Sequence, residues 1–421
     1  MDVMDKELKV PKLRFKDDGG REFPQWKERS FRDITYVPNS KSVDGKVYPV
    51  YSISNVDGFV SREVQFSEGV LEYADKSKCK VVLPGTFAYN PARINVGSIG
   101  YQNLAFPVMV SPLYVVFNVI HEVNDKFMWY LLHSDLLLKQ ICKFAEGSVR
   151  VCFSYDKLCK VALSLPMLPE QRKIADFLSA YDELIDNQKK RVEALKLRKK
   201  GLLQKIFSQE IRFKDDEGRE FPKWKEKTIR EISMLVTKQT GFDYTNVIKS
   251  SLVTSPNDDT LPYLQTKNFS GLHFNYKTDY YISRKYGQIY PKLFLNEPCL
   301  LMSIVGASVG NIGLFSGETH CFLSGAICVI RLSPGENINY VYQYMIASRF
   351  QQKVKLNTKT GAQATITIED IRSLSIKYPT LPEQRKIADF LSVADHQIAL
   401  EEKRLDTMRL IKKALLQQLF V

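Results

Sequence analysis

The chain has 421 residues, more than one ordinary domain needs, and its 44% hydrophobic and 25% charged residues are normal for a globular protein with real cores. The formal net charge of +13 favours a polyanionic partner, most often nucleic acid, although charge alone also fits a basic protein without one. Scattered cysteines without zinc-ligand spacing, no signal-peptide pattern and no apolar run of about 18 residues predict a cytoplasmic protein without a metal site or membrane span.

The first recognisable segment is a polar leader, residues 14–34, which returns at residues 212–232 with 15 of 21 positions identical. The segment LPEQRKIADFLS at residues 168–179 recurs unchanged at residues 381–392. Two such matches in the same order indicate a tandem duplication. The first match is displaced by 198 residues and the second by 213, so the second copy is 15 residues longer. Weaker matches place the extra residues between Ile232 and Pro262, where a polar stretch predicts a surface loop.

Each copy contains a segment rich in Tyr, Phe, Val and Ile that is punctuated by Gly, Pro, Asn and Asp, which predicts an α+β domain. We expect strands at residues 47–54, 113–120 and 326–332, and helices at 125–142 and 340–355. The domain boundaries that we predict are 1–167 for the first globular domain, 168–208 for a first long helix, 209–380 for the second globular domain and 381–421 for a second long helix.

The two long helices are predicted from an apolar seam with a mean spacing of 3.5 residues. Pro169 and Pro382 suit the first turn of a helix, and eight of ten seam positions are apolar in each copy. Each helix would be about 60 Å long, too long to be covered by a small domain, so we expect the two to pack as an antiparallel coiled coil related by a pseudo-twofold axis.

The polar seam positions predict a register for this pair. Setting Lys199 against Glu401 and Gln188 against Lys412 would satisfy all four groups, and it places the local dyad between residues 192 and 195. Phe420 matches Phe207, after which the first copy runs directly into the second leader. We therefore expect the end of the second helix to lie close to the first leader.

At this point the chain resembles a known family, the specificity subunits of type I restriction–modification systems. The resemblance covers nearly the whole chain. It is carried by Leu-Pro-x-Gln before each long helix (residues 168–171 and 381–384), by Gly-x-x-Gly turns (97–100 and 310–313) and by Phe-Pro-x-Trp openings (23–26 and 221–224). The doubled order of these motifs is more specific than any one of them.

The resemblance implies two target-recognition domains joined by two antiparallel helices, each domain reading one half of a split, asymmetric DNA target. It also implies a subunit without catalytic activity that directs two methyltransferase subunits and the restriction subunits. S-adenosylmethionine, ATP and Mg²⁺ would then be bound by those partners, and this chain would carry no cofactor.

The residues agree with a non-catalytic chain. The polar-Pro-Pro-aromatic loop by which amino-methyltransferases hold a target base is missing, since the segment 90–93 (NPAR) departs from it at its third position. The sequence also lacks the GxxxxGK[ST] loop that binds nucleotide phosphates. The Asp-Asp pairs at 17–18 and 215–216 lie beside basic residues in a glycine-bearing leader, which favours solvated turns over a metal site.

Base-reading candidates follow from comparing the two copies. Positions that are polar in both copies but differ between them are candidates, because the two half-sites should differ, and Arg, Asn, Gln and Lys side chains hydrogen-bond base edges. The alternative is drift of exposed residues after duplication. The candidate pairs are Ser54/Lys267, Arg62/Asn275, Asn90/Ser303, Asn95/Ser308 and Arg150/Gln363.

Other residues suit contacts with the DNA backbone. Arg93, Lys359 and the lysines at 76, 78 and 80 are candidate phosphate contacts. Asn55 and Asn268, unchanged between the copies, are expected to fix a turn or to touch phosphate.

Two other functions compete with a DNA-specificity subunit. One is a coiled-coil protein adaptor that does not bind DNA, which salt-dependent binding to duplex DNA would exclude. The other is a self-contained nuclease or methyltransferase, which the missing motifs disfavour.

Overall fold

The computed structural model describes residues 11–39, 47–55, 58–61, 78–145, 153–359, 361 and 363–420. The chain forms two compact units. The first contains the residues up to Lys189 together with 403–421, and the second contains 190–402. Each unit therefore combines one globular domain with a segment of each long helix, α6 (Leu168–Phe207) and α13 (Leu381–Leu419).

The first unit is built around a four-stranded sheet in the order β2-β9-β6-β7. A β3–β4 hairpin, a β5–β8 pair and a β1–β10 pair complete its strands. The strands are β1 (Lys27–Ser30), β2 (Thr35–Tyr36), β3 (Tyr51–Ser54), β4 (Gly58–Ser61), β5 (Lys80–Val82), β6 (Phe87–Tyr89), β7 (Ile99–Tyr101), β8 (Val108–Val110), β9 (Val115–Val119) and β10 (Ala162–Leu165). The helices are α1 (Phe31–Ile34), the 3₁₀ turn η2 (Ile94–Val96), α3 (Asp125–Leu132), α4 (Asp135–Ala145) and α5 (Tyr155–Leu158).

The second unit repeats this plan. Its four-stranded sheet β12-β21-β18-β19 corresponds to the first unit's main sheet. A second sheet has the order β16-β13-β20-β17, in which β17 and β20 are the counterparts of β5 and β8. The strands are β11 (Lys225–Thr228), β12 (Ser233–Lys238), β13 (Thr260–Leu264), β14 (Phe269–Ser270), β15 (His273–Phe274), β16 (Tyr281–Ser283), β17 (Phe294–Leu295), β18 (Cys299–Ser303), β19 (Ile312–Phe315), β20 (Cys321–Leu323), β21 (Ile327–Leu332) and β22 (Ser375–Tyr378). The helical elements are α7 (Ile229–Ile232), α8 (Gly241–Asp243), η3 (Tyr244–Ile248), η4 (Lys249–Ser251), η5 (Thr266–Asn268), α9 (Lys285–Ile289), α10 (Ile338–Ile346), α11 (Ser348–Asn357) and α12 (Ile368–Ser373).

The residues added in the second copy form helical turns as well as the predicted loop. The elements α8, η3 and η4 come first, and the polar residues 253–259 that follow are exposed, as expected for a surface loop.

Two predicted helices are each divided in two. The segment predicted at 125–142 breaks between α3 and α4, where the Ser134 hydroxyl donates to the Leu131 carbonyl and accepts from the Leu137 amide. The segment predicted at 340–355 breaks between α10 and α11, because Ala347 adopts an extended backbone (φ −69°, ψ 147°).

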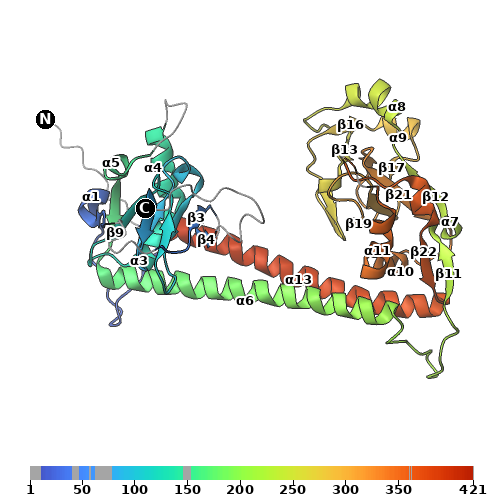
Figure 1. The fold of residues 1–421 in the computed structure, drawn as a ribbon, viewed down its shortest axis with the longest axis horizontal. Coiled ribbons are helices and arrows are strands. Elements are labelled where there is room, and N and C mark those ends of the chain that lie inside the picture. The colour runs from blue at the N-terminus through green and yellow to red at the C-terminus, as the bar shows by residue number, and fades with distance from the viewer. Residues whose placement is uncertain are drawn as a thin grey trace. The chain divides into compact units, whose positions relative to one another are not determined.

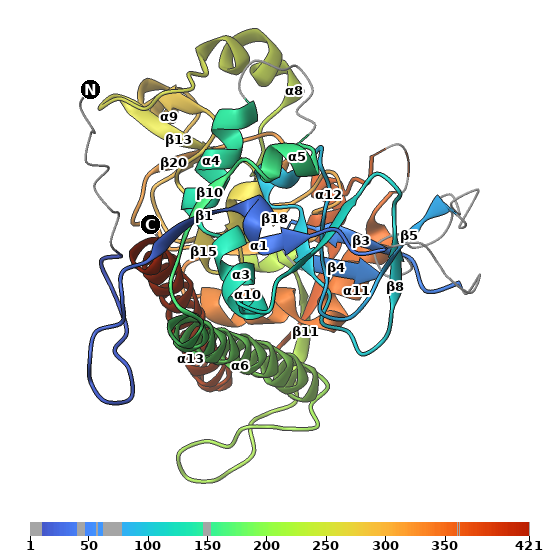
Figure 2. The ribbon, with the colours of Figure 1, turned by 90° about the vertical axis from the view of Figure 1, so that its left-hand side faces the viewer.

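The long helices run side by side (Figures 1 and 2), and each unit shows the same antiparallel pairing. In the first unit Lys412 of α13 pairs with Asp182 of α6, and in the second unit Lys199 of α6 pairs with Asp395 of α13. These two pairs are related by the 213-residue repeat. All ten predicted seam positions of each helix are buried or half-buried, so the predicted seam is confirmed.

The predicted register is wrong. Lys199 meets Asp395, which lies six residues from Glu401 and therefore about 9 Å away along α13. Glu401 instead accepts from Arg191 at 3.0 Å. The midpoint between the repeat-related positions Asp182 and Lys199 falls between residues 190 and 191 of α6, and not between 192 and 195 as predicted. The polar seam residues Lys199, Lys412 and Glu401 are thus satisfied by residues flanking the opposite seam and not by one another.

Each globular domain takes part of its core from both long helices. In the first unit, Ile174 and Leu178 of α6 and Leu419 and Phe420 at the end of α13 pack with the buried side chains of the domain. In the second unit the corresponding contributions are Leu203, Ile206 and Phe207 of α6 with Ile387, Ala388 and Leu391 of α13. Neither domain is therefore complete without the end of one helix and the start of the other.

Candidate nucleic-acid interface

The two Gly-x-x-Gly turns are built by glycines with different tasks. The first glycine of each turn, Gly97 or Gly310, has a φ of 88°, which side chains disfavour. The second lies under an aromatic ring, since a Cβ on Gly100 would meet Phe59 at 2.9 Å and one on Gly313 would meet Phe269 at 2.6 Å. Each turn is thereby held against the neighbouring hairpin, β3–β4 in the first unit and β14–β15 in the second.

In the first unit this arrangement brings together several predicted site residues. Ser54 ends β3, while Asn90, Arg93 and Asn95 lie in the turn between β6 and β7. The Ser98 hydroxyl donates to the Ile53 carbonyl at 2.9 Å, which fixes that turn beside the hairpin. Arg93 is exposed and Asn95 is half-exposed, so both remain candidates for contact with DNA.

Asn90 has a structural task in the same turn. Its carboxamide oxygen accepts from the Ala92 amide at 3.0 Å, and its own amide donates to the Ser98 carbonyl at 3.0 Å. Asn90 is half-exposed. Asn90 therefore remains a candidate base reader only through its carboxamide nitrogen.

In the second unit the turn contacts a loop that also carries predicted DNA-contacting residues. The Gly306 amide donates to the Ala364 carbonyl at 2.8 Å, and Lys359 and Thr365 pair as a short antiparallel bridge. This places Ser308 beside the loop that carries Lys359 and Gln363, both of which are exposed. Lys267 and Asn275 lie at the base of the β14–β15 hairpin, where the Asn275 amide donates to the Asn268 carbonyl at 2.8 Å.

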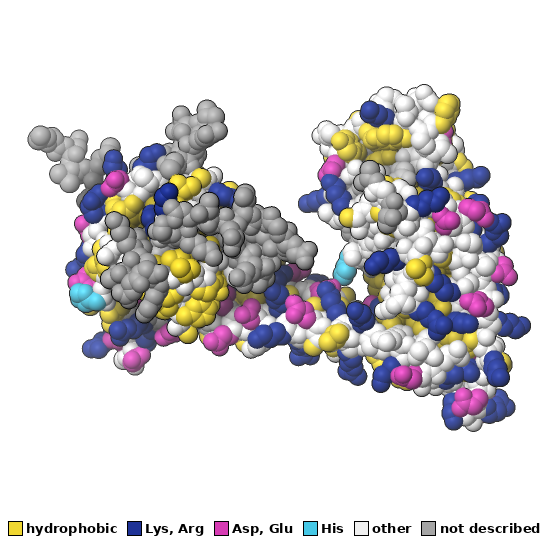
Figure 3. All heavy atoms as spheres, viewed as in Figure 1, with side chains coloured by type: hydrophobic (Ala, Val, Ile, Leu, Met, Phe, Trp, Pro, Cys, Tyr) yellow, Lys and Arg dark blue, Asp and Glu magenta, His cyan; other side chains and the backbone are white. Residues whose placement is uncertain are grey.

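Some of these side chains already have partners. Lys267 pairs with Asp279, and the Asn275 carboxamide oxygen accepts from the Lys277 amide at 3.0 Å. Both residues remain exposed, so these contacts do not remove them from the surface. Lys and Arg side chains lie over much of the visible face of this unit, on the right of Figure 3.

The structure corrects the predictions for Ser303 and Lys80 and decides between the two roles predicted for Asn268. Ser303 is fully buried within β18, so it belongs to the core and cannot reach a base edge in this conformation. For Asn268 the first of the two predicted roles is confirmed: it is 4% exposed and its carboxamide oxygen accepts from the Gln265 amide, so it fixes a turn. The Lys80 ammonium donates to the Tyr114 carbonyl at 2.6 Å and partial burial lowers its pKa, which disfavours it as a phosphate contact. Arg62, Arg150 and Lys76 lie outside the described residues.

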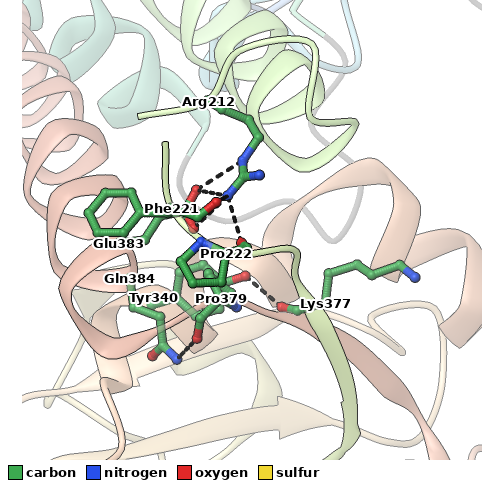
Figure 4. A network of polar contacts seen from close by, with 8 residues as sticks. All are labelled: Arg212, Phe221, Pro222, Tyr340, Lys377, Pro379, Glu383 and Gln384. Carbon is green, nitrogen blue, oxygen red and sulfur yellow. Dashed lines mark hydrogen bonds and ion pairs between the residues drawn. The ribbon is translucent and has the colours of Figure 1, made fainter. Parts of the chain in front are cut away.

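In each unit, one buried ion pair fixes the leader to the start of a long helix. These two ion pairs were not among the predicted site residues. Figure 4 shows the one in the second unit, where Arg212 donates to both carboxylate oxygens of Glu383 at 3.0 Å and to the Pro222 carbonyl at 3.0 Å. In the first unit Arg14 holds Glu170 at 2.7 Å, and the Trp26 indole also donates to Glu170 at 3.1 Å. Both glutamates have fully buried side chains. The signal for these anchors was their identity in both copies.

A glutamine that follows each anchoring glutamate holds the chain entering the helix. Gln384 donates to the Pro379 carbonyl at 3.0 Å, and Gln171 donates to the Pro166 carbonyl at 2.9 Å. The Leu-Pro-x-Gln motif is therefore a helix-entry device. The Tyr340 hydroxyl donates to the Lys377 carbonyl at 2.6 Å and joins α10 to the same region (Figure 4).

A second anchor ties each globular domain to the helix pair. Asp395 accepts from Lys199 of α6 at 2.5 Å and from Gln343 of α10 at 2.6 Å. In the first unit Asp182 accepts from Lys412 and from the Tyr130 hydroxyl of α3, the latter at 2.7 Å. Tyr130 and Gln343 are themselves related by the repeat, so the same joint is made twice with different side chains.

The described residues contain no group of three or more His, Cys, Asp or Glu side chains placed to hold a metal ion. The Asp-Asp pairs of the leaders fit turns, since Asp17 accepts from the Gly19 and Arg21 amides, and these contacts with Arg21 lower its pKa. Over the same part of the chain, the helices are all too short or too polar to cross a membrane.

The architecture defines a class of protein with two copies of one globular domain, each of which packs on segments of both long helices. The sequence profile of the type I restriction modification DNA specificity domain matches residues 25–197 and 223–409. The chain belongs to this family. It is accordingly a DNA sequence-recognition subunit and not an enzyme.

Relatives and solved structures agree with this assignment. The MjaX and MjaVIII type I restriction enzyme specificity subunits of Methanocaldococcus jannaschii are 25% identical over 320 residues and 23% identical over 313 residues. Each match covers 71% of this chain, and 68% and 71% of the respective relative. A structure of a type I restriction–modification assembly matches 95% of this chain and 98% of its own with a TM-score of 0.58 at 16% identity. The S subunit from M. genitalium matches 98% and 99% with a TM-score of 0.54 at 14% identity, so the fold is shared.

Proposed function

We propose that the chain reads a bipartite, asymmetric DNA target and directs methyltransferase and restriction subunits to it in the cytoplasm. The observation that carries this proposal is that the two domains present different polar side chains on equivalent loops of one scaffold. Asn95 in the first turn is replaced by Ser308 in the second, and Ser54 beside the first hairpin by Lys267 beside the second. Two different readers on the same scaffold suit two different half-sites.

The partners follow from what the two copies share. Residues that are identical in both copies, such as those of the leaders and of the helix starts, offer a partner two equivalent docking surfaces. We therefore expect two methyltransferase subunits for each specificity subunit, with the restriction subunits added to that core. S-adenosylmethionine, ATP and Mg²⁺ would be bound by those partners.

Protection mapping with the methyltransferase partner bound tests this function. We expect two short sequence-specific blocks of protected DNA on either side of a spacer whose sequence is tolerated. One continuous specific block would contradict the bipartite reading. A chain that shows no salt-dependent binding to duplex DNA would instead support a protein adaptor.

A further inference from the structure

A pocket of about 430 Å³ lies in the second unit where β12, β13 and β20 end. Its walls include Gln239, Tyr263 and Ser324, and Lys238 and Thr266 stand among its other lining residues. Gln239 follows β12 in the stretch that differs in length between the two copies. Gln239 therefore has no aligned residue in the first copy.

Among the described residues, three that line this pocket carry a buried polar atom without a partner: Gln239, Ser324 and Gln265, whose carboxamide oxygen is the atom concerned. The Gln239 side chain is 2% exposed; its carboxamide oxygen accepts from the Tyr263 hydroxyl at 2.9 Å, while its carboxamide nitrogen has no hydrogen-bond partner. The Ser324 hydroxyl, on a residue 8% exposed, also has none. A buried polar group without a partner costs free energy. Three such groups lining one pocket point to a polar ligand that completes them.

The surroundings indicate which ligand. Thr266 precedes the candidate base reader Lys267, and the Ile304 amide donates to the carbonyl of Ala326 in the pocket wall at 2.9 Å. The turn that carries Ser308 begins directly after Ile304. Lys238 is exposed at the pocket, and no hydrogen bond or ion pair with another described residue engages its ammonium, which suits a neighbouring phosphate.

We propose that this pocket receives a base edge of the half-site read by the second domain, and that Gln239 selects that base. The inference rests on the proposed function and deepens it. The tyrosine hydroxyl holds the carboxamide oxygen, so the free N–H groups point to an acceptor on the base: N7 of a purine, O6 of guanine or O4 of thymine. Cytosine, whose major-groove edge offers only a donor, would leave the Gln239 carboxamide nitrogen without a partner.

The experiment is a selection of bound duplexes from a library with every half-site position randomised, using the full-length chain in complex with its methyltransferase partner. Q239L removes both polar groups, and we expect preference at one base pair of one half-site to fall by about tenfold or more. Q239E replaces the donor by an acceptor, and preference at that base pair should move toward cytosine. The other half-site should be unchanged in both variants, which also reports that the complex is folded.

Two serine variants form a matched control. S324A removes an unpartnered buried hydroxyl from the pocket, whereas S303A removes one that does not line it. S324A should weaken selection at the same base pair as Q239L, and S303A should leave every position unchanged. Y263F, which keeps the ring and removes the hydroxyl that orients Gln239, provides a milder variant if Q239L fails to fold, and it should reduce the same preference.

The outcomes separate this proposal from the function on which it rests. If the wild-type complex enriches no sequence, the proposed function fails. If the wild-type complex is selective and both Q239L and Y263F keep its preference at every position, the amide is satisfied by water alone and the pocket assignment is overturned.

Discussion

Lys199 and Asp395 form an ion pair across the two long helices at 2.5 Å, with side chains only 9% and 15% exposed. Burial lowers the pKa of Lys199, and the hydrogen bond from Lys199 to Asp395 opposes that shift. The same carboxylate also accepts from Gln343 of the globular domain. The joint between helix and domain is electrostatic as well as apolar.

Breaking this joint on one side should destabilise the second unit strongly. D395N leaves the Lys199 ammonium buried without its counter-ion, and we expect a loss of about 3 kcal/mol in the free energy of unfolding, measured with urea. The double variant K199M/D395L should recover most of that loss, because it removes both charges. K196A, which breaks the more exposed Lys196–Glu402 pair, is the control and should cost under about 1 kcal/mol. Equal losses in the free energy of unfolding for D395N and K196A would show that the buried ion pair stabilises the fold no more than the exposed one.

The two leader anchors should respond unequally to the same substitution. R212M leaves the Glu383 carboxylate fully buried without its arginine partner, whereas after R14M the Trp26 indole still donates to Glu170. We expect R212M to destabilise the chain more than R14M by about 1 kcal/mol, the size of one retained hydrogen bond. Thermal unfolding of the two single variants and the double variant measures the difference. A larger loss for R14M would contradict this account.

The repeat predicts that the chain can be circularly permuted. The Ile211 amide donates to the Lys205 carbonyl at 3.2 Å, and the equivalent Leu13 amide donates to the Gln418 carbonyl at 3.1 Å. The same junction is thus made once through the chain and once through space, which confirms that the end of α13 lies beside the first leader.

A Ser-Gln-Glu linker copied from residues 208–210 should therefore join Phe420 to Leu13, with new termini opened between Gln209 and Glu210. We expect this permutant to select the same two half-sites as the original chain, as read by duplex selection. A folded permutant that had lost one half-site would argue against equivalent junctions.

The helix pair should set the distance between the half-sites. Seven residues inserted after Lys190, together with seven after Lys403, would preserve the seam and lengthen the pair by about 10 Å, or at most about three base pairs. Methylome mapping should then show the same half-sites with a longer spacer. An insertion in α6 alone should fail, because it separates Lys199 from Asp395. Altered half-sites with the original spacer would exclude the helices as the determinant.

Acid should weaken the second unit partly through Glu226. Contacts with Ser375 and with the lysines at 377 and 353 lower the pKa of Glu226 to about 2. Because the folded-state pKa lies below that of the unfolded chain, the stabilisation is complete above about pH 4.5 and is lost as pH falls toward 2. E226Q should flatten the decline in stability over this range, whereas E217Q, on the exposed leader, should leave the wild-type slope. Parallel slopes for wild type and E226Q would refute the assignment.

The features that could be predicted are those that occur in both copies of the repeat. The duplication and the seam from Ile174 to Ile206 required only repetition and periodicity. The register could not be predicted, because Lys199 reaches a carboxylate flanking the seam and no periodicity identifies flanking residues. Ser303 was misassigned because polarity in both copies does not reveal burial. Gln239 was not predicted, because it lies where the second copy is longer and the first copy has no aligned residue to compare with it.

The packing of Leu419 and Phe420 against Phe127 in the first domain has a consequence for biosynthesis. The ribosome makes most of this domain in the first 178 residues, yet the side chains that close its core are added more than 200 residues later. The second domain receives Phe207 before its own strands are made, so it meets no such delay. The domain translated first must therefore wait with an open apolar core while the other is synthesised, and that interval is when the nascent protein most needs a chaperone.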